Sequence, residues 1–310
     1  MQLGVSHQCL LCPRQCSVNR AVQKGFCGAG EGIEVSAICL HRGEEPPLVG
    51  EAGPDKGAGV VNIFFAHCNL QCIYCQNGEI SGRTVKPSAI HYNSVGEVVE
   101  RCCELLPLSS GVLGFVTAAH YAHWLPGIVE GIHDKGMHPT VVYNSSGYES
   151  VDTLRSLEGL VDIYLPDFKY MDSSLAQCYS NAADYPAVAQ AALREMRRQV
   201  GSGLKTDNGV AYRGLIVRHL VLPGAVDNSL QCLEWLADEF PFGLHLSLMA
   251  QYYPPHTGLP SPLDRPLTSE EYSVVVSRAE SLGLTDGWIQ ELESREHYRP
   301  DFSRINPFEP

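Results

Sequence analysis

The stretch that decides the fold reads Phe64-Phe65-Ala66-His67-Cys68-Asn69-Leu70-Gln71-Cys72-Ile73-Tyr74-Cys75-Gln76-Asn77. An apolar run that begins at Val60 leads into it and predicts a buried β-strand. Three cysteines with the spacing C-x3-C-x2-C therefore follow the carboxyl end of that strand. A loop this short can bring three thiolates around one small metal cluster. A four-iron cubane held by only three thiolates keeps one iron open for a ligand that does not come from the protein.

The open iron suits S-adenosylmethionine (SAM), because the amino and carboxylate groups of an amino acid chelate iron well. With the SAM sulfonium beside the cluster, one electron can enter a carbon–sulfur bond and release a 5′-deoxyadenosyl radical. We therefore predict a [4Fe–4S] cluster on Cys68, Cys72 and Cys75, with Tyr74 packed against the adenine. The alternatives are ordinary buried cysteines, or a zinc knuckle that His67 completes.

Short apolar runs alternate with segments of helical period along the rest of the chain, a pattern typical of βα units on a parallel sheet. The predicted strands are Val60–Ala66, Gly111–Thr117, Thr140–Tyr143, Val161–Leu165, Leu215–Val221 and Leu244–Met249. The predicted helices lie near Val95–Leu106, Trp124–Lys135, Ser150–Leu157, Ala187–Val200, Ser229–Glu239 and Ser269–Leu282. Six such units fit a partly closed barrel or a doubly wound sheet. In both folds the active site lies at the carboxyl ends of the strands.

Charge, apolar content and cysteine content restrict the classes of protein to which this chain can belong. The chain has 310 residues and a formal net charge of −13, without a block of Lys and Arg, which argues against a nucleic-acid partner. No stretch approaches the ~20 apolar residues that span a bilayer, and the amino terminus has no signal-peptide pattern. We therefore expect a cytoplasmic protein without a membrane partner. Twelve cysteines in such a chain indicate metal or redox chemistry.

Three regions are predicted from these patterns. Residues 1–55 form a cysteine-rich amino-terminal cap, residues 56–290 form the barrel, and residues 291–310 form a polar carboxyl-terminal strap.

The cysteine loop, with an aromatic residue before its last cysteine, is similar to the signature of the radical SAM superfamily. Its flanks resemble the subfamily related to pyruvate formate-lyase activating enzyme. The likeness continues through Leu40–Leu48, Tyr143–Glu149, Asp162–Tyr170, Arg218–Gly224 and Leu248–Tyr252. The resemblance implies an α/β fold, a partial (β/α)6 radical SAM barrel, with SAM lying across the strand ends.

The same resemblance implies further SAM contacts, besides Tyr74 and Asn77 of the cysteine loop. Thr117 and His120 stand where activating enzymes often carry a glutamate for the methionyl amino group. Asn144 and Ser146 stand in a turn that faces the SAM carboxylate and ribose. The alternatives are a purely structural turn for the latter pair, and for His120 a polar rim position or a metal pair with His123.

Charged residues at the next strand ends complete the predicted SAM site. Asp167 and Lys169 are two residues apart, so they point to the same side, and they resemble the Asp-x-Lys of activating enzymes. A structural ion pair is the alternative. Arg218 and His219 interrupt a very apolar strand, where an unpaired charge is costly, so we expect one of them to reach the cavity.

A second set of cysteines, Cys9, Cys12, Cys16 and Cys27, can hold a zinc ion or an auxiliary iron–sulfur cluster. The alternative is a loop of free thiols. Cys178 follows the predicted fourth strand and is a candidate hydrogen-atom donor, although a lone thiol without function is the simpler interpretation.

The resemblance implies that the enzyme takes a hydrogen atom from a glycine of a partner glycyl radical enzyme, with flavodoxin or ferredoxin as electron donor. The chain lacks the insert for two extra clusters that many larger activases carry after the cysteine loop. Two alternatives therefore remain open. The first is an epimerase or other modifier of a sugar, peptide or small molecule with a cysteine hydrogen donor, and the second is a metal-bound scaffold without catalysis.

Overall fold

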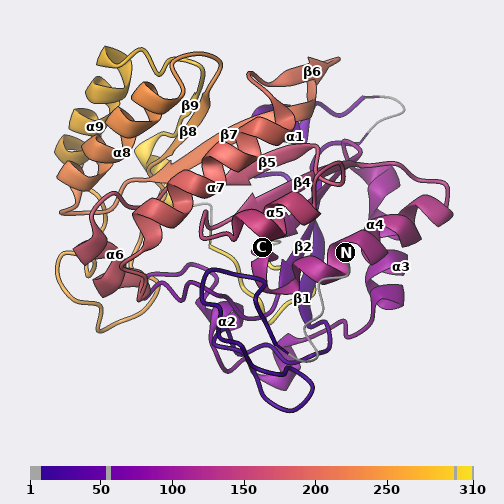
Figure 1. Ribbon diagram of the computed structural model, residues 1–310. Helices are drawn as coiled ribbons and strands as arrows, with labels where there is room; N and C mark the ends of the chain where they lie inside the picture. The colour runs from indigo at the N-terminus through magenta and orange to yellow at the C-terminus, as the bar shows by residue number, and fades with distance from the viewer. Residues whose placement is uncertain (1–7, 54–56, 297–298, 309–310) are drawn as a thin grey trace.

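A computed structural model describes residues 8–53, 57–296 and 299–308 of the chain. Its centre is a sheet in which neighbouring strands follow the order β1-β2-β3-β4-β5-β7-β8-β9, with β6 paired to β7 (Figure 1). The strands from β2 to β9 along this order run parallel, whereas β1 is antiparallel to β2. The strand bounds are β1 (Val35–His41), β2 (Val60–Phe65), β3 (Val112–Val116), β4 (Thr140–Ser145), β5 (Ile163–Pro166), β6 (Lys205–Asp207), β7 (Val210–Leu220), β8 (His245–Met249) and β9 (Gly287–Ile289).

Helices connect the parallel strands and pack along the outside of the sheet, as Figure 1 shows for α4, α5, α7 and α8. The α-helix bounds are α1 (Pro46–Val49), α2 (Gly78–Ser81), α3 (Val95–Leu105), α4 (Leu125–Asp134), α5 (Val151–Ser156), α6 (Ser173–Ser180), α7 (Tyr185–Val200), α8 (Val226–Glu239) and α9 (Ser269–Ser281). Short 3₁₀ turns lie at η1 (Pro87–Ala89), η2 (Leu106–Leu108), η3 (Ala119–Trp124) and η4 (Leu292–Glu296). Local sequence fixes some helix starts, since Ser94 with Glu97 and Thr268 with Glu271 form capping boxes at α3 and α9.

The predicted α/β fold with a partial (β/α)6 barrel and a cysteine-rich amino-terminal region is confirmed. Each predicted strand overlaps an observed one, and each predicted helix overlaps α3, α4, α5, α7, α8 or α9. The strands β1, β6 and β9 and the helices α1, α2 and α6 were not predicted from the sequence. Strand β7 begins earlier than predicted, at Val210, because its first residues form a hairpin with β6. None of the helices in the described ranges is long and apolar enough to cross a membrane.

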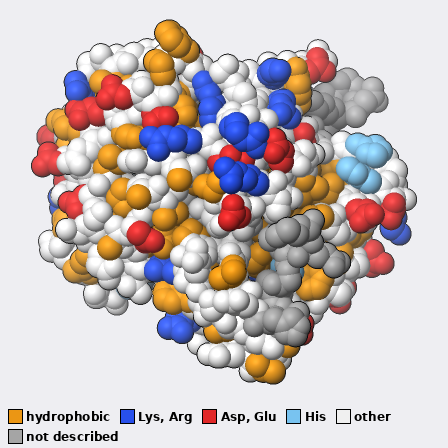
Figure 2. Space-filling model, in the orientation of Figure 1, with side chains coloured by type: hydrophobic (Ala, Val, Ile, Leu, Met, Phe, Trp, Pro, Cys, Tyr) orange, Lys and Arg blue, Asp and Glu red, His pale blue; other side chains and the backbone are white. Residues whose placement is uncertain are grey.

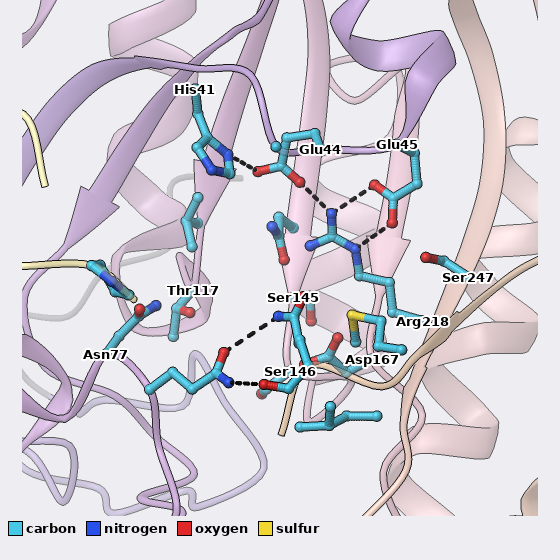
Figure 3. Close-up of a pocket in the computed structure, with 18 of the residues that line it drawn as sticks. His41, Glu44, Glu45, Asn77, Thr117, Ser145, Ser146, Asp167, Arg218 and Ser247 are labelled. Carbon is cyan, nitrogen blue, oxygen red and sulfur yellow. Dashed lines mark hydrogen bonds and ion pairs between the residues drawn. The ribbon is translucent and has the colours of Figure 1, made fainter. Parts of the chain in front are cut away.

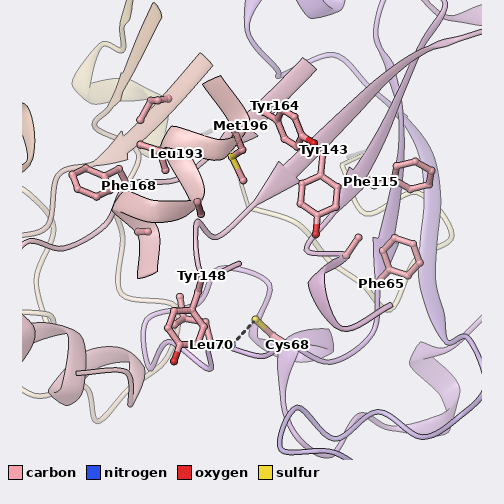
Figure 4. Close-up of a cluster of buried hydrophobic side chains, with 14 of the residues drawn as sticks. Phe65, Cys68, Leu70, Phe115, Tyr143, Tyr148, Tyr164, Phe168, Leu193 and Met196 are labelled. Carbon is pink, nitrogen blue, oxygen red and sulfur yellow. Dashed lines mark hydrogen bonds between the residues drawn. The ribbon is translucent and has the colours of Figure 1, made fainter. Parts of the chain in front are cut away.

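The core lies between the sheet and the helices that cover it. Every residue of β2 and β3 is buried, as expected for central strands of a parallel sheet covered on both faces. Figure 4 shows Phe65 and Phe115 from these strands near one another, and their ring centroids are 6.3 Å apart. The Tyr143 and Tyr164 rings of β4 and β5 meet edge to face at 6.1 Å. Packing of these large side chains holds the four strands in register.

The molecular surface mixes charges of both signs. On the face drawn in Figure 2, acidic and basic side chains lie next to one another. Arg198 of α7 pairs with the exposed Glu158 and with the buried Glu195. Exposed ion pairs such as Arg198–Glu158 contribute about 0–1 kcal/mol each, so the fold depends mainly on its buried core.

We predict that Phe115→Ala lowers the free energy of unfolding by about 3–5 kcal/mol, because it leaves a cavity between β3 and its neighbours. Phe115 is fully buried, whereas Phe242 is 81% exposed and serves as the matched control. Urea unfolding followed by circular dichroism measures both variants. Equal losses of stability in the two would contradict this description of the core.

Candidate active site

A pocket of about 410 Å³ opens at the carboxyl ends of the parallel strands. Its walls include many of the residues that the sequence predicted as site residues. These are Cys72, Tyr74, Cys75, Asn77, Thr117, Asn144, Ser146, Asp167, Lys169 and Arg218. The loop after β2 therefore faces the same cavity as the ends of β3, β4, β5 and β7.

Strand register explains why these residues meet. Val116 of β3 pairs with Asn144 of β4, so the turns that follow the two strands lie side by side. Asp167, just after β5, forms a bridge with Arg218 of β7. Polar residues that are far apart in the sequence thus line one edge of the sheet, where ligands of parallel α/β folds bind.

The three cysteines of the loop lie close enough for their charges to interact. Burial raises the pKa of the Cys68 thiol to about 12, and the charges of Cys72 and Cys75 contribute to this rise. Cys68 is 8% exposed, and the other two are half-buried and line the pocket. Because metal ligation requires thiolates, binding a cluster here releases protons. Within the described ranges, no three Cys, His, Asp or Glu side chains are already gathered closely enough to hold a metal ion.

Hydrogen bonds tie the cysteine loop to the barrel. The Ser180 hydroxyl donates to the Cys72 sulfur at 3.0 Å and also bonds the Tyr170 hydroxyl at 2.8 Å. The Tyr170 hydroxyl in turn lies 2.6 Å from that of Tyr74. This chain of hydroxyls fixes the ring of Tyr74 at the pocket wall.

His67 does not turn toward the cysteines. Its Nε2 lies 2.9 Å from a carboxylate oxygen of Glu34, and its Nδ1 lies 2.9 Å from the Gly82 carbonyl oxygen. Both ring nitrogens are therefore engaged by other partners, which disfavours the zinc knuckle in which His67 is the fourth ligand.

Asp167 and Lys169 both face the pocket and also pair with each other, with 2.5 Å between Lys169 Nζ and Asp167 Oδ2. Burial by itself would lower the pKa of Lys169, but the charge and hydrogen bond of Asp167, together with the charges of Cys72 and Cys75, outweigh this effect and raise it. Lys169 is therefore a fixed positive charge at the pocket wall. The charge of Lys169 also lowers the pKa of Cys72, against the larger effect of burial.

Two acidic residues of the pocket, Glu44 and Glu45, were not predicted from the sequence. Figure 3 shows both carboxylates bonded to the guanidinium of Arg218, and His41 bonded to Glu44. The side chains of Glu44, Glu45 and Arg218 are 7%, 5% and 14% exposed. The isolated arginine in an apolar strand was the available signal, because such a charge needs a buried partner.

Two polar residues of the pocket have unfavourable features that their local structure does not explain. The Ser146 hydroxyl is buried without a hydrogen-bond partner among the described residues, and it stands at the pocket wall. Thr117 has a φ of 58°, which is rare for a β-branched residue and costs about 1–3 kcal/mol. An unsatisfied hydroxyl and a strained backbone at a cavity both indicate a site shaped for a polar ligand.

Besides Cys68 and the four amino-terminal cysteines, the predicted site residues His219, His120 and Cys178 do not line this pocket. His219 points to the other side of β7 from Arg218, and its Nε2 bonds the hydroxyl of Ser229 at 2.9 Å. Burial lowers the pKa of His219 to about 4. His120 is fully buried with Nε2 bonded to the Ala66 carbonyl oxygen, and Cys178 is exposed on α6. Successive residues of a strand point to opposite faces, so His219 points away from the pocket that Arg218 lines. The η3 turn directs the ring of His120 into the core.

A buried acid supports the turn after β4. Glu149 is 2% exposed and accepts hydrogen bonds from the hydroxyls of Ser145 at 2.6 Å and Tyr143 at 3.0 Å. The Ser145 hydroxyl also accepts from the backbone N–H of Gly147. Gly147 has a φ of 78°, and a Cβ there would lie 2.2 Å from the Asp167 carbonyl oxygen. Glu149 thus fixes the turn that presents Asn144 and Ser146.

Comparison with known proteins adds evidence on the fold. No family model matches the chain. An uncharacterized protein of Methanocaldococcus jannaschii is 29% identical over 291 residues, which cover 91% of this chain and 77% of that protein. A radical SAM methyltransferase from Sphaerobacter thermophilus has a similar structure, with a TM-score of 0.51 and 14% identity over 77% of this chain and 67% of that one. The chain therefore has the fold of a radical SAM enzyme.

Two further solved structures are similar at a lower level. AdoMet-bound anSMEcpe has a TM-score of 0.46 and 12% identity, with 76% of this chain and 58% of that one covered. Methylornithine synthase has a TM-score of 0.45 and 12% identity, with 68% of this chain and 58% of that one covered. The chain thus spans less than two thirds of the length of these two proteins.

We predict that Glu149→Gln changes how stability depends on pH. Burial raises the pKa of Glu149 from 4.5 to about 7, so the folded protein binds this proton more tightly than the unfolded chain does. The stability that this proton binding contributes is complete below pH 4.5 and is lost as the pH rises to 7. Relative to wild type, Glu149→Gln should therefore gain about 3 kcal/mol between pH 4.5 and 8.

Urea unfolding at both pH values measures this gain. Glu130→Gln, an exposed change on α4, should keep the wild-type pH profile and is the control. Parallel profiles for wild type and Glu149→Gln would contradict the prediction.

Proposed function

We propose that this protein is a radical SAM enzyme that carries a [4Fe–4S] cluster on Cys68, Cys72 and Cys75. The observation that carries the proposal is that Cys72 and Cys75 share one pocket with polar side chains from four neighbouring strand ends. Three thiols without a fourth protein ligand suit a cluster with an open iron. The unsatisfied Ser146 hydroxyl and the fixed charges of the pocket suit the polar groups of SAM.

The cluster and SAM, when bound, supply one-electron cleavage of a carbon–sulfur bond and a carbon radical that abstracts a hydrogen atom. The protein's own residues position the reactants and exclude water. Lys169 attracts the SAM carboxylate, and Asp167 orients Lys169 through their 2.5 Å contact. Asn144 and Ser146 offer hydrogen-bond partners to the carboxylate and ribose. Tyr74 provides an apolar face for the adenine.

Arg218, Glu44 and Glu45 form a second group of charges in the same pocket. Their mutual ion pairs hold them in place, and removal of Arg218 would leave two buried carboxylates without their cation. We assign this group to the substrate end of the pocket, because the cysteine loop and Lys169 account for the SAM end. The role closest to the sequence resemblance is abstraction of a hydrogen atom from a glycine of a partner enzyme, with flavodoxin or ferredoxin as electron donor.

A second candidate is direct modification of a sugar, peptide or other small molecule. The specific observation in its favour is the charged group of Arg218, Glu44 and Glu45, which suits a polar substrate better than the neutral backbone of a glycine loop. The exposed position of Cys178 on α6 disfavours it as the hydrogen-atom donor. An epimerase of this kind would need another donor.

We predict that anaerobically reconstituted protein converts SAM to 5′-deoxyadenosine when dithionite is present. Cys75→Ala should abolish the product, because the cluster loses a ligand. Lys169→Met should keep the iron content of wild type and weaken SAM binding at least tenfold, because a buried charge facing the carboxylate is lost. Liquid chromatography of the product, iron analysis and equilibrium dialysis with labelled SAM measure the three effects.

Cys103→Ala on α3 is the matched cysteine control and should keep both iron and product. Absence of product from wild-type protein that carries a full cluster would overturn the proposal and favour a scaffold without catalysis. If product forms, electron paramagnetic resonance of a mixture with a glycyl radical enzyme tests the activase role.

A further inference from the structure

The amino-terminal segment gathers its four cysteines in one region. Cys9, Cys12 and Cys27 are 1%, 4% and 2% exposed, and Cys16 is half-buried. Cys9 and Cys16 belong to one small apolar cluster. Arg14, between Cys12 and Cys16, stacks on the ring of Phe26 at 4.2 Å, which brings the neighbouring Cys27 to the same region. The four cysteines therefore lie in one region, although no three side chains of the described ranges are yet close enough to hold a metal ion.

The backbone around these thiols folds into a tight knuckle. The Cys9 N–H donates to the Val18 carbonyl at 2.9 Å, and the Ser17 N–H donates back to the Cys9 carbonyl at 3.1 Å. Gln15 and Ser17 both have positive φ angles, of 39° and 55°. Two such residues beside Cys16 are unusual, because L-residues avoid this region unless the surroundings impose it. With so little apolar side-chain volume, the knuckle needs another source of stability.

Arg20 provides an independent observation. It is only 3% exposed, and no carboxylate in the described part of the chain lies within ion-pair distance of it. Its Nη1 donates to the His120 carbonyl at 2.6 Å, its Nη2 lies 3.8 Å from the Cys27 sulfur, and its buried Nε has no partner. The backbone N–H of Ala29 also points at the Cys27 sulfur, at 3.4 Å. A cation and an N–H donor thus converge on one thiol.

A buried guanidinium without a counter-charge is strongly unfavourable. Four neutral thiols would not compensate it. Four thiolates around a divalent metal, or around a [4Fe–4S]²⁺ core, carry a net charge of about −2 and would compensate it. The unpaired Nε of Arg20 is then available to a sulfur of such a centre.

We propose that Cys9, Cys12, Cys16 and Cys27 bind an anionic tetrathiolate metal centre, for which Arg20 is the buried counter-cation. Because four protein ligands leave no open position, the centre is structural or transfers electrons, and it does not bind SAM. Metal binding draws in the four sulfurs, which supplies the stability that this segment lacks.

The amino-terminal segment that would hold this centre is also hydrogen-bonded to the cysteine loop of the pocket. Arg14, between Cys12 and Cys16, donates to the carbonyls of Asn69 and Leu70, inside the Cys68–Cys72 loop. Its guanidinium stacks on Phe26, next to Cys27, at 4.2 Å. A metal that orders the knuckle would therefore order Arg14 and the loop beneath it.

The test separates this centre from the SAM cluster. A variant with Cys68, Cys72 and Cys75 all changed to Ser should still carry metal, either about one zinc or about four irons with matching sulfide. Adding Cys12→Ser and Cys27→Ser should remove it. Inductively coupled plasma mass spectrometry and sulfide analysis distinguish zinc from iron. A metal-free triple variant that keeps the wild-type circular dichroism spectrum would overturn the proposal, whatever the outcome of the SAM assay.

Arg20→Gln tests the counter-cation without touching a ligand. Release of the amino-terminal metal to a chromogenic chelator from the triple-serine background should be at least tenfold faster with Arg20→Gln, since partners of metal ligands commonly change affinity by about 10–100-fold. Arg155→Gln, at an exposed position on α5, should release metal at the original rate. Equal release rates for all three would overturn the role of Arg20.

Discussion

The parallel register of the central strands is the constraint on which the pocket depends. Side chains that come after β2, β3, β4 and β5 belong to segments with little in common, yet each is carried to the same edge of the sheet. The register is enforced by large buried side chains such as Phe65, Phe115 and Tyr143, which leave no freedom to slip by one residue. A cysteine loop placed after any central strand would therefore open onto this edge, and its function is decided by the side chains that the neighbouring strand ends present to it.

Buried charge is the second organising feature. Arg218 lies on an otherwise apolar strand and meets Glu45, which is 173 positions away in the sequence. Buried ion pairs contribute little net stability compared with apolar residues of the same volume, because desolvation offsets the attraction between the charges. Burial would raise the pKa of Glu44, but Arg218 and His41 lower it well below its ordinary value. Charges kept ionised at a pocket wall are better explained by recognition of a ligand than by folding.

The sequence predicted the strands β2, β3, β4, β5, β7 and β8, the cysteine loop and several of the pocket's polar residues, since these depend on local apolar runs and on the residues directly after each run. It could not predict Glu44 and Glu45, because their partner is brought to them only by the sheet order. His219 was expected beside Arg218 as an alternative, but successive residues of a strand point to opposite faces, so only one of the two can reach the pocket. His120 does not line the pocket either, because the η3 turn directs its ring into the core.

The two cysteine sets differ in a way that their local surroundings explain. The loop at Cys72 meets the positive charge of Lys169 from across an open pocket, so a cluster there stays accessible to a small molecule. The amino-terminal set meets Arg20 inside a closed knuckle, where Nε has no access to solvent. Each set thus has one cation beside its sulfurs, but only the first has space for a further ligand. Because Arg14 joins the knuckle to the cysteine loop, the closed site is placed to stiffen the open one, and precise positioning of a reactive centre requires such support from the residues behind it.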